Sequence, residues 1–311
     1  MAFMQDRAAA LGLDAGLLWG IDEGRLLVGP PAEGSLAIGT RALGDSYQVR
    51  RRAGDSASDA WHASRPGAAA AQGSFDALLF KAMVTRNMSW YSRWGVNTDG
   101  GSGLFSWPSA SAVDNVATNV ARLTHRLVGD ALLASTNTTT LKQAAVGDAR
   151  HDTALPVSIV DAVVSSFASG RGVHALAFHH HPWLNASATV AAASAALSVC
   201  GLPPGAALAG TLWGPVGDAC GNFWPAWWRD RARLNLTDYN SGWSQYGESI
   251  SWNDDAEAAV WSAQLAPTYQ PLADLQKCAA PWTGAADNAG CLLVTLALPP
   301  HSVALLEAVL Q

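Results

Sequence analysis

The sequence predicts an α/β segment followed by an all-β segment, and two observations indicate this. The first part of the chain alternates short apolar runs with stretches of helical spacing, an order that is typical of parallel α/β units. After Asp130 the rhythm changes to short strands separated by turn residues, the pattern of an antiparallel β-sandwich. We therefore expect two domains, residues 1–129 and residues 130–311.

The first segment offers two strands and two helices. Ser35–Ala42 is a short apolar run that predicts a buried strand, whereas Gly44–Gly73 has no sustained period and predicts a long loop. Phe75–Arg86 carries apolar residues at helical spacing, and Ser89–Val96 predicts a strand after it. Val113–Leu127 has one apolar face and predicts a second helix.

The second segment is dominated by strand-like runs. Helix-like stretches interrupt it around Pro267 and Pro271, and Pro281–Gly290 predicts a loop. The expected strands are Val157–Phe167, Val173–His180, Ser187–Val199, Ala207–Trp213, Cys291–Leu298 and Ser302–Val309.

Composition excludes several classes of protein. Nearly half of the 311 residues are hydrophobic, so the chain is not disordered. The net charge is -6 with 14% charged residues, which does not suit a nucleic-acid partner. No apolar run reaches the length of a membrane span. The 14 tryptophans suit stacking on sugar rings and also ordinary core packing.

Four cysteines allow two disulfides in three possible pairings. The pair Cys278–Cys291 is preferred because a loop is expected between them, which leaves Cys200 with Cys220. No two cysteines form a CxxC pair, so a zinc site is not expected.

Four Asn-x-Ser/Thr sequons predict glycosylation and a secreted or lysosomal/vacuolar protein. They begin at Asn87, Asn137, Asn185 and Asn235. Residues 1–20 carry no signal-peptide pattern, so either the sequons are idle or the chain begins downstream of its true start. The second alternative is favoured because of the family resemblance described next.

Segments in the middle of the chain resemble a known family. Trp90–Gly95, then Gly101–Phe105 and a helix ending at Asp130, are similar to the last strand and helix of the barrel in glycoside hydrolase family 39. That family includes β-xylosidases and α-L-iduronidases. The similarity covers roughly residues 74–311.

Three later segments extend the resemblance. Trp252–Asp255 with Trp261 is similar to an acidic, tryptophan-containing segment late in the family. Leu197–Gly205 with Asp218–Cys220 downstream is closer to the iduronidase branch. The tight turn and alternating strand of Leu298–Glu307 resemble the segment that closes the β-sandwich after the catalytic barrel in retaining glycosidases.

The resemblance implies a partial (β/α)8 TIM barrel over residues 1–129, followed by a C-terminal β-sandwich. A full barrel takes about 250 residues, so a missing N-terminal barrel half is an expected partner. The family cleaves glycosidic bonds by the retaining mechanism with two glutamates about 5 Å apart, one of them in an Asn-Glu-Pro motif. This sequence contains no Asn-Glu-Pro, and its glutamates are Glu23, Glu33, Glu248, Glu257 and Glu307.

The nucleophile is expected near the end of the seventh barrel strand. Counting back from Tyr91, that strand would be Leu36–Ala42, and no carboxylate occurs near Thr40. Asp45 is the nearest carboxylate and Glu23 is the other candidate, although both stand in turn-like sequence. The catalytic glutamate pair is therefore not found in this chain.

The resemblance also implies a sugar pocket at the end of the last barrel strand, since barrels carry their sites at that end. The expected substrate-binding residues are Tyr91, Trp94, Asn97 and Asp99. The implied function is hydrolysis of a β-xyloside or an α-L-iduronide. The alternative is a non-catalytic carbohydrate-binding or extracellular structural protein that kept the scaffold.

No metal or other cofactor is expected. Consecutive side chains of a strand point to alternate faces, so His179, His180 and His181 cannot all bind one ion without a turn, and a strand-end loop is favoured there. No Gly-rich loop that opens a helix supports a nucleotide site.

Overall fold

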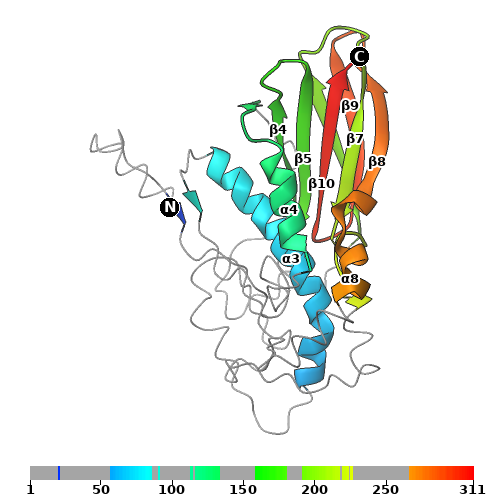
Figure 1. Ribbon diagram of the computed structural model, residues 1–311. Coiled ribbons are helices and arrows are strands. Elements are labelled where there is room, and N and C mark those ends of the chain that lie inside the picture. Colours follow the sequence, from blue (N-terminus) through cyan, green and yellow to red (C-terminus); the bar gives the residue numbers. More distant parts are fainter. Residues whose placement is uncertain are drawn as a thin grey trace, which may run out of the picture.

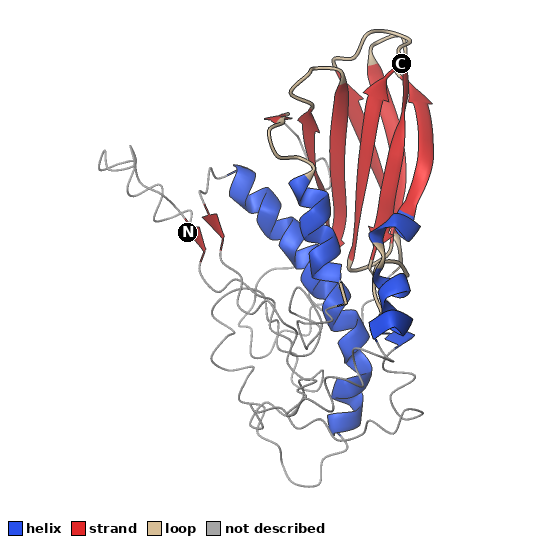
Figure 2. Cartoon of the chain, viewed as in Figure 1, coloured by secondary structure: helices blue, strands red, loops and turns tan. Residues whose placement is uncertain are grey.

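The structure, a computed structural model, is a three-layer arrangement of helices, a large antiparallel sheet and a smaller antiparallel ribbon (Figures 1 and 2). It describes residues 20–21, 57–85, 90–91, 113–114, 116–133, 158–180, 191–217, 219–223, 225–226 and 266–311.

The central layer is a six-stranded sheet in the order β3-β4-β5-β10-β7-β8, in which every neighbouring pair is antiparallel. The strands are β3 (Ala131–Leu132), β4 (Ile159–Ser166), β5 (Gly172–His180), β7 (Ala207–Val216), β8 (Ala279–Ala285) and β10 (Ser302–Leu310). The last strand of the chain, β10, lies in the middle of the sheet between β5 and β7.

The two central strands are buried on both faces, because successive side chains of a strand point to opposite faces. On β5, Leu176 and Phe178 belong to the core beneath the helices, while Ala175 and Ala177 belong to the core beneath the ribbon. Large side chains thus face the helical layer and small ones face the ribbon.

One face of the sheet is covered by helices. They are α3 (Ala57–Thr85), α4 (Val116–His125) and α8 (Ala266–Ala273), with the short 3-10 helix η5 (Leu275–Cys278) after α8. Val116, Val120 and Leu123 of α4 share a core with the sheet. Helices from before residue 130 and strands from after it therefore bury the same apolar surface (Figure 1).

The start of α3 differs from the prediction. Residues 57–73 fall in the expected loop Gly44–Gly73 but are helical, and they include four consecutive alanines, the best helix formers. Gly73 lies where α3 crosses α4, and a methyl group there would overlap the side chain of Val116. The glycine that resembled a loop residue in the sequence is a close-packing residue between two helices.

The opposite face of the sheet is covered by a two-stranded antiparallel ribbon, β6 (Ala193–Cys200) paired with β9 (Cys291–Leu298). Leu292, Val294 and Leu296 point inward from β9 and are buried. The alternation of buried and exposed residues along β9 is the expected pattern for a strand with one solvated face.

The expected strands that the structure describes are confirmed to within a few residues at β4, β5, β7, β9 and β10. The expected strand Ser187–Val199 is confirmed in its second part, because β6 begins at Ala193. The expected loop Pro281–Gly290 is wrong in its first half, because β8 occupies Ala279–Ala285 as the edge strand next to β7. A proline is tolerated on an edge strand, where its missing N–H faces away from the ladder. The expected strand Ser35–Ala42 lies outside the described residues.

A partial barrel is not shown. The described residues do contain a parallel pair, β1 (Gly20–Ile21) with β2 (Trp90–Tyr91), and α3 lies between them in the chain. This is the connectivity of a strand–helix–strand unit, but a pair of two-residue strands does not make a barrel.

The close approach of β7 to β10 predicts a specific intolerance at Gly210. A methyl group at Gly210 would overlap the backbone carbonyl oxygen of Glu307, and backbone at the centre of a sheet has little room to move. We expect Gly210→Ala to lower the free energy of unfolding by about 2–3 kcal/mol. Urea unfolding followed by tryptophan fluorescence measures this.

The matched control is Gly284→Ala on the neighbouring strand β8. There the added methyl meets the far end of the half-buried Trp282 side chain, which can shift, so we expect a cost of about 1 kcal/mol or less. Equal losses in the two variants would contradict the packing argument.

Candidate functional site

The predicted sugar-site residues fall almost wholly outside the described part of the chain. Tyr91 is described as the last residue of β2, where it lies opposite Ile21 of β1. The other candidates lie outside the described residues: Glu23 and Asp45 for catalysis, and Trp94, Asn97 and Asp99 for binding. The four sequon asparagines, Asn87, Asn137, Asn185 and Asn235, also lie outside the described residues.

The parallel register of β1 and β2 fixes one relation that bears on the site. Gly20 lies opposite Trp90 and Ile21 opposite Tyr91, so the two strands end at the same edge. In parallel α/β units the carboxyl ends of the strands carry the functional groups.

The disulfides join Cys200 to Cys291 and Cys220 to Cys278, so the preferred pair Cys278–Cys291 is wrong. Cys278 precedes the seven-residue strand β8 and Cys291 follows the turn after it. A seven-residue strand spans roughly 23 Å, far beyond the reach of a disulfide.

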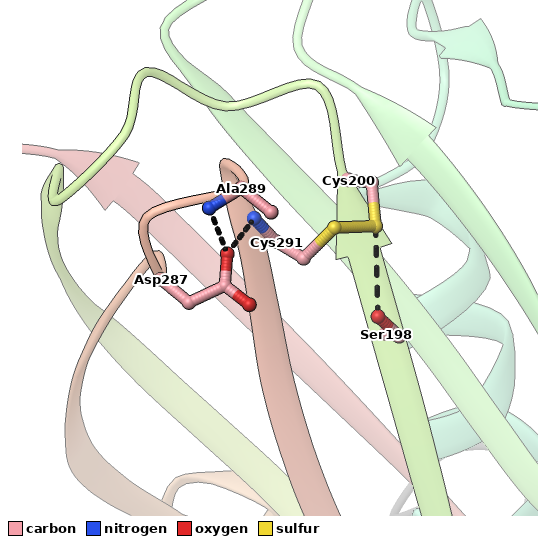
Figure 3. The surroundings of a disulfide bond; sticks show 5 residues. All are labelled: Ser198, Cys200, Asp287, Ala289 and Cys291. Carbon is pink, nitrogen blue, oxygen red and sulfur yellow. Dashed lines mark hydrogen bonds between the residues drawn. A yellow bond between two sulfur atoms is a disulfide. The ribbon is translucent and has the colours of Figure 1, made fainter.

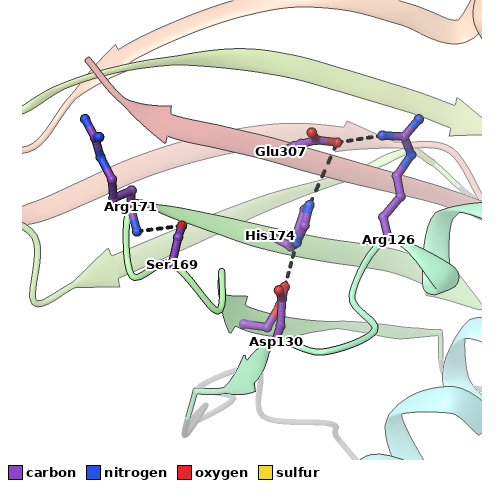
Figure 4. Close-up of polar contacts among 7 residues, drawn as sticks. Arg126, Asp130, Ser169, Arg171, His174 and Glu307 are labelled. Atoms are coloured by element: carbon purple, nitrogen blue, oxygen red, sulfur yellow. Dashed lines mark hydrogen bonds and ion pairs between the residues drawn. The ribbon is translucent and has the colours of Figure 1, made fainter.

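A polar network lies on the helical side of the sheet, beside the turn that follows α4 (Figure 4). The Nδ1–H of His174 donates to Asp130 Oδ2 at 2.6 Å, and the hydroxyl of Ser165 donates to the same oxygen at 2.7 Å. Arg126 donates to Glu307 Oε2 at 2.8 Å. The Nε2 atom of His174 lies 3.8 Å from that oxygen, beyond hydrogen-bond length.

Strand register brings this network together. His174 of β5 lies directly opposite Glu307 of β10, and the hydrogen bond from Ser165 places Asp130 on the other side of the imidazole. The Asp130 oxygen already accepts two hydrogen bonds and the Glu307 oxygen accepts one from Arg126. The arrangement therefore ties the turn after α4 to the sheet.

Arg126 has a second role in this network. Its guanidinium carbon lies 4.2 Å from the centroid of the Trp213 ring, a cation–π distance. Among the described residues the indole Nε1 of Trp213 has no hydrogen-bond partner. The guanidinium of Arg126 thus stacks on a buried tryptophan ring, and its hydrogen bond to Glu307 holds it there.

Sequence reasoning missed this network. His174 and Glu307 each place a titratable side chain next to apolar residues within a central strand. A charged or titratable side chain at an interior strand position is a usable signal, because it requires a partner when buried.

The three consecutive histidines do not form a strand-end loop where the structure describes them. His179 and His180 are the last two residues of β5 and are buried on opposite faces. His179 donates from Nδ1 to the carbonyl of Leu298 at 2.9 Å, and His180 Nδ1 lies 2.9 Å from Ser74 Oγ. Within the described ranges, no group of three His, Cys, Asp or Glu side chains could hold a metal ion.

Burial shifts the titration of His179. Loss of hydration lowers the pKa of this imidazole below its usual value, and the hydrogen bond to the carbonyl of Leu298 opposes part of that shift. The neutral ring with its proton on Nδ1 is the form that this site holds.

A further ion pair borders a cavity between α3 and the edge of the sheet. Lys81 Nζ lies 2.5 Å from Asp161 Oδ1, and both side chains are mostly buried. The cavity has a volume of about 240 Å³ and is lined by Lys81, Val84, Thr85, Leu132, Leu133, Ala162 and Val163. This volume is below the roughly 300–1,000 Å³ of typical ligand pockets, and the two charges already neutralise each other.

No family model matches the chain, and neither does any curated protein. Three solved structures show a weak likeness. A GH39 enzyme from Xanthomonas axonopodis pv. citri is 12% identical with a TM-score of 0.40, over 77% of this chain and 40% of that one. A monomeric beta-xylosidase from Caulobacter crescentus CB15 is 11% identical with a TM-score of 0.44, over 77% and 41%. A GH51 arabinofuranosidase from Xanthomonas axonopodis pv. citri is 13% identical with a TM-score of 0.34, over 77% and 35%.

These neighbours are glycoside hydrolases of two families, so the likeness does not single out family 39. This chain spans about two fifths of the length of the first two structures. At these identities and TM-scores the likeness says nothing about activity or substrate. Among the described helices, none is both long enough and apolar enough to span a bilayer.

Removal of the shared acceptor should disrupt the polar network. Asp130→Ala leaves the hydroxyl of Ser165 and the Nδ1–H of His174, both largely buried, without their acceptor. We expect the free energy of unfolding to fall by about 2–3 kcal/mol in urea titrations. Ser169→Ala, which removes one acceptor in an exposed turn, is the control and should cost less than about 1 kcal/mol.

Acid should destabilise the fold through His179. Because its pKa is lower in the folded protein than in the unfolded chain, the unfolded chain binds the proton first as pH falls. Stability should therefore be fully present above about pH 6.5 and decrease below it, by at most about 1.4 kcal/mol per pH unit.

Urea titrations between pH 5 and pH 7 measure this slope. His179→Asn keeps a donor for Leu298 and cannot titrate, so its slope should be shallower than that of the wild type. Val173→Ala, a cavity variant on the same face of β5, should keep the wild-type slope at lower stability. An unchanged slope in His179→Asn would rule out this histidine as the source.

Proposed function

We propose that this chain belongs to a carbohydrate-active protein of the retaining glycoside hydrolase type, similar to family 39. The observation that carries the proposal is the parallel pairing of Gly20–Ile21 with Trp90–Tyr91, with α3 between them in the chain. The second of these strands begins the segment that resembles the last barrel strand of that family.

The register favours Glu23 over Asp45 as the nucleophile. Glu23 follows Ile21 by two residues, and Ile21 lies opposite Tyr91. Two residues of chain reach at most about 7 Å. The Glu23 carboxylate can therefore come within reach of a sugar bound beside Tyr91. Asp45 follows Ile21, the last residue of the strand, by 24 residues.

We assign a role in this reaction to Glu23 and to the four binding candidates. Glu23 would attack the anomeric carbon and form the glycosyl-enzyme intermediate of double displacement. Tyr91 and Trp94 would stack on the sugar, and Asn97 and Asp99 would bind its hydroxyl groups. This sequence lacks the Asn-Glu-Pro motif that holds the acid/base glutamate in the family. The acid/base carboxylate would therefore come from another position in this chain or from a further barrel segment.

The substrate we propose is a β-xyloside or an α-L-iduronide, on the resemblance alone. Two disulfides support an oxidising compartment, in keeping with a secreted or lysosomal protein. A non-catalytic carbohydrate-binding role is the other outcome that the test below distinguishes.

The test uses the whole chain with aryl β-xyloside and aryl α-L-iduronide substrates. We expect hydrolysis that Glu23→Gln reduces by at least about 10⁴-fold, because loss of a nucleophile removes the covalent step. Asp22→Asn is the matched control, one residue away with the same kind of charge loss, and should change the rate by less than about tenfold.

Titration of the same proteins with xylose-configured and iduronate-configured ligands, followed by tryptophan fluorescence, separates binding from turnover. Binding without hydrolysis would indicate the non-catalytic role. Absence of both binding and hydrolysis for every ligand would overturn the proposal, and equal loss of rate in both variants would exclude Glu23 as the nucleophile.

A further inference from the structure

The two disulfides differ in their surroundings. Cys200 is exposed and Cys291 is half-buried, at the loop end of the β6–β9 ribbon (Figure 3). Cys278 is 7% exposed and belongs to the core beneath the helices, with Cys220 packed against it. Cys220 is half-buried, as Cys291 is, so the first bond is distinguished by its exposed Cys200 and the second by its buried Cys278. Thiol–disulfide exchange requires a nucleophile to reach a sulfur atom, so the first bond is the more open to attack from solvent.

The backbone of Cys291 is hydrogen-bonded to the turn that precedes it. The N–H of Cys291 donates to Asp287 Oδ1 at 2.8 Å, and its carbonyl accepts from the N–H of Asp287, also at 2.8 Å. Both groups are thus directed to the turn, although Cys200 is the residue directly opposite. The disulfide adds a covalent link across the ribbon at this position.

The neighbours of the two sulfurs make them unequal as leaving groups. Ser198 Oγ lies 3.6 Å from Cys200 Sγ, and since a disulfide sulfur carries no proton, the hydroxyl is the donor. A donor stabilises a thiolate on Cys200. The carboxylate of Asp287, hydrogen-bonded to the N–H of Cys291, disfavours negative charge on that side. Exchange should therefore release Cys200 and leave the incoming thiol on Cys291.

We propose that Cys200–Cys291 is a thiol-modification site that exchanges with low-molecular-weight thiols of the glutathione class, whereas Cys220–Cys278 is structural. The attacking thiolate forms a bond to Cys291 Sγ, the Cys200–Cys291 bond breaks, and Cys200 leaves as a thiolate that takes a proton from water. A second thiol then attacks the mixed disulfide and frees Cys291. Two thiols are oxidised to one small disulfide and one protein disulfide is reduced.

Exchange should loosen one end of the ribbon. Beyond the disulfide, the turn is held to the neighbouring segment by hydrogen bonds from Leu202 N to Gly290 O at 3.0 Å and from Gly205 N to Asp287 O at 3.2 Å. Amide hydrogen exchange in residues 199–205 and 287–293 should accelerate after reduction, while the amides of β10 stay protected.

The first experiment titrates the oxidised, full-length chain with glutathione under native conditions. Free thiols are trapped by alkylation and located by peptide mass mapping. We expect Cys200 to be alkylated at least about tenfold faster than Cys220 or Cys278, and the glutathione adduct to be found on Cys291. Equal rates for both bonds, or no reduction of either below denaturing urea concentrations, would overturn the proposal.

Two variants test the leaving-group assignment without removing a cysteine. Ser198→Ala should slow exchange at Cys200–Cys291 by about threefold to tenfold, the value of one hydrogen bond in the leaving group. Ser194→Ala is the matched control, since it is also exposed on the outer face of β6, and it should exchange at the wild-type rate. A wild-type rate in Ser198→Ala, or an adduct on Cys200, would overturn the assignment.

Discussion

Burial of β10 on both faces is the constraint on which the other features of this structure depend. The strand lies between β5 and β7, so its hydrogen bonds are satisfied within the sheet and its side chains supply both cores. Val303 and Leu305 face the helices, while Ala304 and Ala308 face the ribbon. Each fully buried large side chain contributes roughly 1.5–3 kcal/mol, and the alternation distributes that gain between two layers.

The polar residues of the central strands follow from the same constraint. A charged group on a strand covered on both sides must find a partner, because an unpaired buried charge is costly. Glu307 meets Arg126, and His174 meets Asp130, so both partners come from the turn after α4. The network thereby fixes the helical layer to the sheet, and Arg126 also covers Trp213.

Helix α3 links this core to the edge where we propose that sugar binds. It lies in the chain between the parallel strands β1 and β2, and it packs on α4, β5 and β10. The β-sandwich would then serve as the rigid support of a site built at the ends of the parallel strands. The two disulfides lie in different layers: one belongs to the core beneath the helices, and the other lies at the exposed end of the ribbon.

Local periodicity made much of this fold predictable. Strand-like runs separated by turn residues located six strands, including Cys291–Leu298 at its observed bounds. Helical spacing located α4 and the C-terminal part of α3. The strand β8 and the first half of α3 were missed because their proline, glycine and alanine content resembles that of loops.

The sequence by itself determined where six of the strands lie, where two of the helices lie, and that four cysteines are available. The tertiary structure decided the cysteine pairing, the meeting of His174 with Glu307, and the alignment of Ile21 with Tyr91. Periods of two and 3.6 residues are local properties of a chain and can be found in a short window. Contacts between residues 58 to 133 positions apart depend on strand order and register, which emerge only when the whole core is packed.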